Sequence, residues 1–124
     1  MTDTLNERLE AIEAGYEFCL AYAAQGRTDD SGSPVREMLG KMFAALDGLG
    51  ALVESAVARE GSAHAASTRV FLDAVKRDAA VAQGAIGLVL DRAAIGSLLV
   101  DNLNATIHLR ALLTDLFLLD QARK

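Results

Sequence analysis

The sequence is poor in the residues that mark several classes of protein. It contains no tryptophan, one proline and one cysteine, and 5% of its residues are aromatic. A single cysteine excludes an internal disulfide framework. Because Cys19 lies between the apolar residues Phe18 and Leu20, we expect it to be a small core residue. With a single proline, little in the chain interrupts long helices.

Positive charge is also scarce. The chain has 12 basic and 17 acidic residues, a formal net charge of −5, and the basic residues are scattered singly. Nucleic acids and anionic membranes attract clustered positive charge, so we expect neither as a partner. The first residues are polar and acidic, unlike a secretory signal, which favours a cytoplasmic protein. The most apolar stretch, Val81 to Val100, includes Asp91 and Arg92, which argues against a membrane-spanning helix.

Helix-forming residues are abundant. The chain has 23 alanines and 19 leucines, against 12 valines and isoleucines together. Alanine and leucine have the strongest preference for the α-helix, and β-branched residues favour strands. A chain of 124 residues is long enough to bury its own core. We therefore expect one all-α domain over residues 1–124.

Glycine and proline indicate where the predicted helices end. A polar segment from Gly26 to Ser33 precedes Pro34, and Gly61 lies before Ser62. A third boundary is placed at Gly96, with the Gly84–Gly87 stretch as the alternative. Between these points apolar residues recur every three or four positions, the helical period. The prediction is an up-down antiparallel four-helix bundle with helices at about 4–25, 34–60, 63–94 and 97–122.

The first two predicted helices carry more apolar or small residues than one core face needs. Small residues at a spacing of three or four let another helix approach closely, so these second faces predict self-association, with a dimer favoured. The alternative is that alanine and glycine simply lie on a solvated face. The residues of this candidate oligomer seam are Gly15, Phe18, Tyr22, Gly40, Ala44, Gly48 and Ala51.

The last predicted helix, 97–122, is apolar around nearly its whole circumference, so we expect it to be the most buried. Its polar exceptions form one narrow stripe: Asp101, Asn104, His108 and Asp115. Arg110 lies at a helical angle close to apolar residues, and we expect it to be drawn inward and paired, with Asp78 as its candidate partner. These five residues are candidates for binding a ligand. The alternative is a solvent-facing seam and a structural arginine.

The sequence offers little for metal binding or catalysis. His64 falls on an apolar face near a helix start, where a partly buried histidine is the simplest interpretation. The chain has two histidines and one cysteine, and neither histidine follows an acidic residue at the spacing of helical di-iron sites. No glycine-rich loop has the features that cradle phosphate. We therefore expect no metal and no cofactor, and an enzymatic function is disfavoured.

These patterns predict a non-catalytic interaction or regulatory protein that acts through self-association and protein partners. The first alternative is a helical bundle that binds a small ligand or cofactor at the stripe around His108. The second is a histidine phosphotransfer protein, which this chain resembles in size and predicted architecture. Those domains carry His-x-x-Lys/Arg-Gly, whereas His64 is followed by Ala-Ala-Ser and His108 by Leu-Arg-Ala. Neither segment matches that motif.

Overall fold

The computed structural model describes residues 3–61 and 65–122, and every regular secondary-structure element in these residues is an α-helix. The prediction of an all-α fold is confirmed. The predicted up-down four-helix bundle is not confirmed, because two of the four expected helices are each divided in two, giving six in the described residues. They are α1 (Asp3–Ala23), α2 (Val35–Leu46), α3 (Leu49–Arg59), α4 (Ala66–Leu90), α5 (Ser97–Ala105) and α6 (His108–Ala122).

The expected helix at 34–60 is interrupted at Gly48. This glycine has φ +67°, the left-handed conformation that costs glycine little and other residues more. The helix then restarts, with the Leu52 amide donating to the Gly48 carbonyl at 3.1 Å. The prediction of one continuous helix here is therefore wrong. As a result, the small residues Gly40, Ala44, Gly48 and Ala51 do not share one helix.

The expected helix at 97–122 is interrupted at Ile107. Its φ is +62°, and it is the one non-glycine residue with positive φ among those described. A left-handed conformation costs an ordinary residue roughly 1–2 kcal/mol, and a β-branched side chain makes it rarer still. The Ile107 amide donates to the Asn104 carbonyl at 3.2 Å, and the Ala111 amide donates to the Ile107 carbonyl at 2.8 Å. No glycine or proline in the sequence marks this break.

The boundary between α4 and α5 lies where Gly96 predicts it. Helix α4 ends at Leu90, α5 begins at Ser97, and the alternative break at 84–87 falls inside α4. A Cβ atom on Gly96 would lie 3.1 Å from the Arg27 carbonyl oxygen and 3.2 Å from that of Thr28. A larger residue here would therefore push against the backbone of the loop after α1, which favours glycine.

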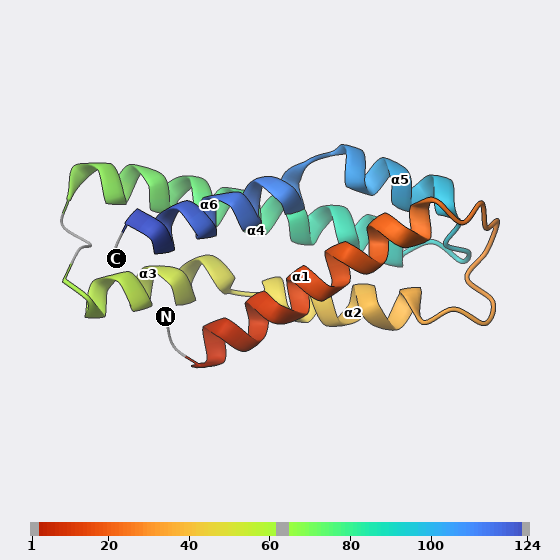
Figure 1. Cartoon of the computed structure of the whole chain (residues 1–124), viewed down its shortest axis with the longest axis horizontal. Helices are drawn as coiled ribbons and strands as arrows, with labels where there is room; N and C mark the ends of the chain where they lie inside the picture. The colour runs from red at the N-terminus through yellow and green to blue at the C-terminus, as the bar shows by residue number, and fades with distance from the viewer. Residues whose placement is uncertain (1–2, 62–64, 123–124) are drawn as a thin grey trace.

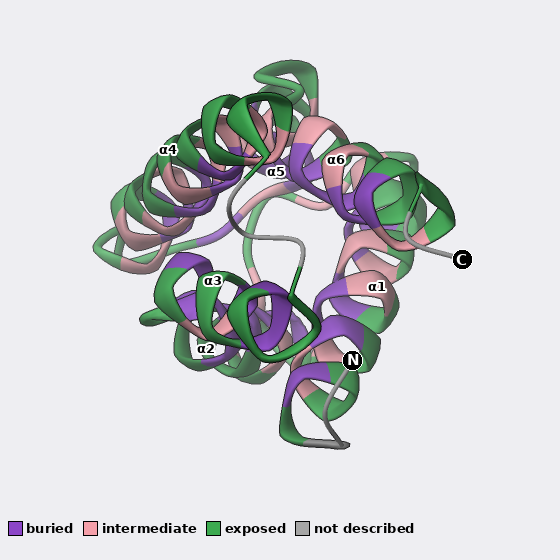
Figure 2. Ribbon diagram, turned by 90° about the vertical axis from the view of Figure 1, so that its left-hand side faces the viewer, coloured by how far each residue is buried: buried purple, intermediate pink, exposed green. Residues whose placement is uncertain are grey.

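The helices run lengthwise around a shared core. In Figure 1, α2 and α3 follow one another along one side of the molecule, and α5 and α6 follow one another along the other. Helix α1 packs mainly against α2 and α5, whereas α4 packs against α2, α3 and α6. Figure 2, which looks along the long axis, shows the buried residues facing inward. None of the helices in the described ranges has the length and hydrophobicity needed to span a bilayer.

Two expectations about burial have different outcomes. Cys19 is a core residue as predicted, since it is fully buried, and burial raises the pKa of its thiol to about 11. The last segment is not the most buried part of the chain, however. Leu98 is 73% exposed, Phe117 is 55% exposed and Leu118 is 57% exposed. A sequence that is apolar on all sides therefore leaves large apolar side chains in solvent.

Candidate interaction surface

The predicted polar stripe is divided by the break between α5 and α6. Asp101 and Asn104 lie on α5, whereas His108 is the first residue of α6 and Asp115 lies two turns further along. Asp101 is exposed, and His108 is half-buried. Asn104 joins α5 to α1, because its amide donates to the Cys19 carbonyl at 3.1 Å. The structure therefore gives Asn104 a packing role and does not align the four residues on one helix.

Asp115 faces another carboxyl group. Its Oδ2 atom is buried without a hydrogen-bond partner in the described part of the chain. Burial first, and then a hydrogen bond with Asp78 of α4 and the negative charge of that residue, together raise the pKa of Asp115 to about 7. At neutral pH this carboxyl is therefore poised between its two protonation states.

Arg110 does not behave as predicted. It is exposed, and no ion pair joins it to Asp78 or to any other described residue. The expectation of an inward, paired arginine is wrong because α6 begins only at His108, after the reversal at Ile107, so the angles of one continuous helix do not apply to it.

Three of the seven residues of the candidate oligomer seam pack within the chain. Gly15 is buried against Met42, which leaves no room for a Cβ atom. Tyr22 is fully buried, and Phe18 is half-buried and stacks on it with ring centroids 6.2 Å apart. These three residues of α1 therefore contact other residues of the same chain. The other four candidates, Gly40, Ala44, Gly48 and Ala51, are exposed.

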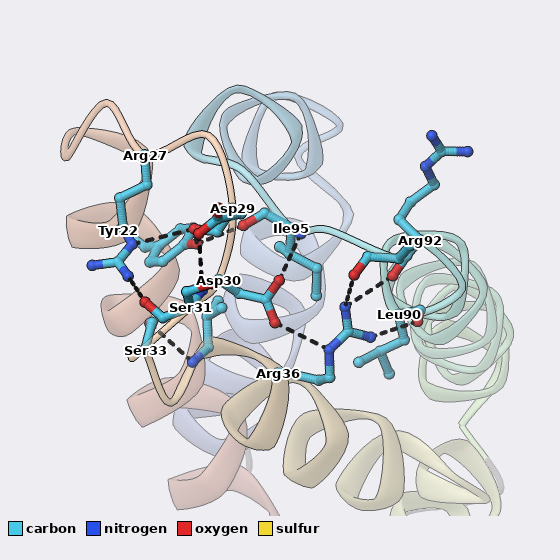
Figure 3. Close-up of polar contacts among 12 residues, drawn as sticks. Tyr22, Arg27, Asp29, Asp30, Ser31, Ser33, Arg36, Leu90, Arg92 and Ile95 are labelled. Atoms are coloured by element: carbon cyan, nitrogen blue, oxygen red, sulfur yellow. Dashed lines mark hydrogen bonds and ion pairs between the residues drawn. The ribbon is translucent and has the colours of Figure 1, made fainter.

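A polar network that the sequence does not suggest fixes one end of the molecule, between the loop after α1 and the loop before α5 (Figure 3). The Tyr22 hydroxyl donates to the Ile95 carbonyl at 2.5 Å and to the Asp29 carbonyl at 3.1 Å. The Ser97 hydroxyl donates to the Tyr22 carbonyl at 2.7 Å and accepts from the Arg27 amide at 2.8 Å. Ser97 thus bonds to Tyr22 of α1 and to Arg27 of the loop after it, rather than capping α5 with its side chain.

Asp30 and Arg36 complete this loop network. Asp30 accepts from the Ile95 amide at 2.9 Å and pairs with the Arg36 guanidinium at 3.2 Å. The hydrogen bond from the Ile95 amide first, and then the Arg36 guanidinium, hold the pKa of the Asp30 carboxyl below its usual range. Arg36 also donates to the carbonyls of Leu90 and Arg92, at 3.0 Å and 2.9 Å. Because these groups satisfy one another, the network is a structural connection rather than a binding site.

A groove between α1 and α6 exposes apolar side chains. It has a volume of about 340 Å³, and its lining is mostly apolar. Leu20 of α1 is 48% exposed and Phe117 of α6 is 55% exposed. The residues that line this α1–α6 groove are Glu13, Tyr16, Glu17, Leu20, Arg110, Leu113, Thr114 and Phe117.

The charges of the α1–α6 groove are separated by sign. Glu13 and Glu17 come from α1, and Arg110 comes from α6. None of the three forms an ion pair within residues 3–61 and 65–122. Of the residues predicted to be functional, Arg110 alone lies in this groove. The only sequence signal for the remaining groove residues was the excess apolar surface of the first and last predicted helices. The sequence did not show where that excess is exposed.

Two further findings concern the identity of the protein. The described residues include no group of three or more histidine, cysteine, aspartate or glutamate side chains arranged to hold a metal ion. His64 lies outside the described residues. No known family model matches the chain, and no curated protein or solved structure matches it significantly.

Proposed function

We propose that this chain is a non-catalytic interaction protein that acts through self-association and protein partners. The observation that carries the proposal is the α1–α6 groove, where Leu20 and Phe117 are about half exposed beside unpaired charges. Covering apolar surface contributes about 25 cal/mol per Å², so a groove with two large exposed side chains is a favourable contact for another protein.

The chemistry of the groove fits contact better than catalysis. Its lining has no histidine and no cysteine, and its carboxylates and its arginine lie on opposite walls. The single lining hydroxyl besides that of Tyr16 belongs to Thr114, and it donates to the Arg110 carbonyl at 2.8 Å. A nucleophile needs a neighbouring base to accept its proton, and Thr114 instead completes a turn of its own helix. These residues are suited to recognising a protein surface.

Sedimentation velocity over a range of protein concentrations tests the proposal. We expect the mass to rise from monomer towards dimer or a larger species between about 1 µM and about 100 µM, the range of a moderate protein contact. A chain that stays monomeric at every concentration and captures no protein partner would contradict the proposed function.

Small-ligand binding is the second candidate function, and the size of the α1–α6 groove favours it. At about 340 Å³ the groove is within the span of ligand pockets, roughly 300–1,000 Å³. An apolar fluorescent dye tests this candidate. Saturable dye binding to a chain that remains monomeric, lost in Phe117→Asp, would favour a ligand over a protein in the groove.

A further inference from the structure

The α1–α6 groove has four corners whose chemistry follows a diagonal pattern. Helices α1 and α6 run in opposite directions along it (Figure 1). Glu13 and Phe117 lie at one end, because both also line the neighbouring hollow that extends to Asp120. Leu20 and Arg110 line the groove but not that hollow, and they lie at the other end of the groove. One diagonal therefore joins two opposite charges, and the other joins two exposed apolar side chains.

We propose that a second copy of this chain covers the α1–α6 groove, related to the first by a two-fold axis that lies in the interface along the diagonal from Leu20 to Phe117. Such an axis exchanges the two corners on either side of it and places each corner that lies on it opposite its own equivalent. It brings Arg110 of each copy to Glu13 of the other, Leu20 to Leu20 and Phe117 to Phe117. Two ion pairs and two apolar contacts then form from one surface. The proposal rests on the self-association proposed above.

Charge is what selects a second copy as the occupant. A groove with charges of a single sign requires a partner of the opposite sign. Here α1 supplies Glu13 with Glu17 beside it, α6 supplies Arg110, and all three are unpaired within the described chain. A second copy turned over about the Leu20–Phe117 diagonal places each charge against its opposite. Complementarity of this kind fixes the orientation of an interface and disfavours other partners.

Charge reversal tests the two ion pairs. In Glu13→Arg alone or Arg110→Glu alone, both pairs of the dimer become repulsive, and we expect the dissociation constant to rise about tenfold. An equal mixture of the two variants should recover the affinity of the wild type, because each pair in the mixed dimer has opposite charges again. A general loss of structure in the variants does not produce such recovery.

Matched controls separate the groove from the rest of the surface. Glu7→Arg and Arg77→Glu make the same charge changes at exposed positions of α1 and α4. We expect both to stay within about twofold of the wild-type dissociation constant. Glu13→Gln and Arg110→Gln are neutral versions, each expected to weaken the dimer about threefold, should a reversed charge impair folding.

The apolar diagonal is tested by Leu20→Asp and Phe117→Asp, each expected to leave the chain monomeric where the wild type is a dimer. Leu98→Asp is the control, because Leu98 is 73% exposed on α5, outside the groove. Circular dichroism establishes that each variant is helical. A dimer that withstands both groove substitutions and the charge reversals overturns this interface while leaving self-association intact. A wild type that remains monomeric overturns both this interface and self-association, and it does so even if a small molecule or another protein binds in the groove.

Discussion

Replacing Tyr22 by phenylalanine removes one oxygen atom from the centre of the loop network. The Tyr22 hydroxyl is the donor to two carbonyl groups, those of Ile95 and Asp29, and the residue is fully buried. Phenylalanine keeps the ring and its stacking on Phe18, so the substitution isolates the hydroxyl. The Ile95 carbonyl loses its short hydrogen bond in a place where water does not replace it.

The expected cost follows from that loss. Leaving a buried acceptor unsatisfied costs about 1–3 kcal/mol, and the bond to Ile95 at 2.5 Å is the shorter of the two. Total stabilities of domains are about 5–15 kcal/mol, so the change is a large fraction. For a chain of this length, each 1 kcal/mol lowers the melting temperature by roughly 4 °C. We therefore expect a fall of about 4–12 °C.

Circular dichroism monitors unfolding, because the chain has no tryptophan for fluorescence. A urea titration measures the change in free energy, and a thermal scan measures the change in melting temperature. Protein concentration is held fixed, because self-association adds to apparent stability. Tyr16→Phe is the matched control. Tyr16 is half-buried, it forms no side-chain hydrogen bond among the described residues, and its replacement should stay within about 0.5 kcal/mol of the wild type. Equal stabilities for Tyr22→Phe and the wild type would refute the structural role assigned to this hydroxyl.

Three further predictions concern the backbone reversals and the buried carboxyl. Gly48→Ala should destabilise the chain by about 1–2 kcal/mol, because the φ of Gly48 is +67°. Gly40→Ala, in open space within α2, should stabilise the chain by up to about 1 kcal/mol. If both substitutions change the free energy of unfolding in urea in the same direction, this reasoning is contradicted. Ile107→Gly should raise the free energy of unfolding by about 1 kcal/mol by relieving a left-handed isoleucine, and a loss in the same assay would count against strain there. The raised pKa of Asp115 means that the folded chain holds this proton up to about pH 7, whereas the unfolded chain releases it near the ordinary value of 3.8. Its contribution to stability is therefore full below pH 3.8 and is lost as pH rises towards 7, so Asp115→Asn should flatten that part of the melting-temperature profile while the exposed Asp101→Asn leaves it unchanged.

Some breaks in the fold were predictable and others were not. Gly96 marks a boundary both by its residue type and by its place before a serine, and the structure uses it. Gly48 is also a residue type that can end a helix. Its spacing from Gly40 suits one face of a continuous helix equally well, so the sequence pattern does not distinguish a break from a continuous helix. Ile107 has no local signal at all. A β-branched residue resists the left-handed conformation, so only packing elsewhere in the chain accounts for it.

The candidate site was predicted less well than the fold, for a similar reason. The stripe of Asp101, Asn104, His108 and Asp115 depended on one continuous helix, and the reversal at Ile107 removes that condition. Asp115 does face a polar group, but this group is Asp78 of α4, which no periodicity within α6 indicates. The groove combines Leu20 and Phe117, residues far apart in the sequence, whose joint exposure depends on how two helices pack.

By itself the sequence determined that this chain is helical, where most of its helices begin and end, and that it has more apolar surface than its core requires. These properties depend on neighbouring residues, through intrinsic helix preference, glycine and proline positions, and a spacing of three or four. The tertiary structure alone decided which apolar faces are covered and which charges are left unpaired. Contacts between helices set both, because each face finds its partner in a distant part of the chain. In this protein the packing of the helices leaves the α1–α6 groove exposed.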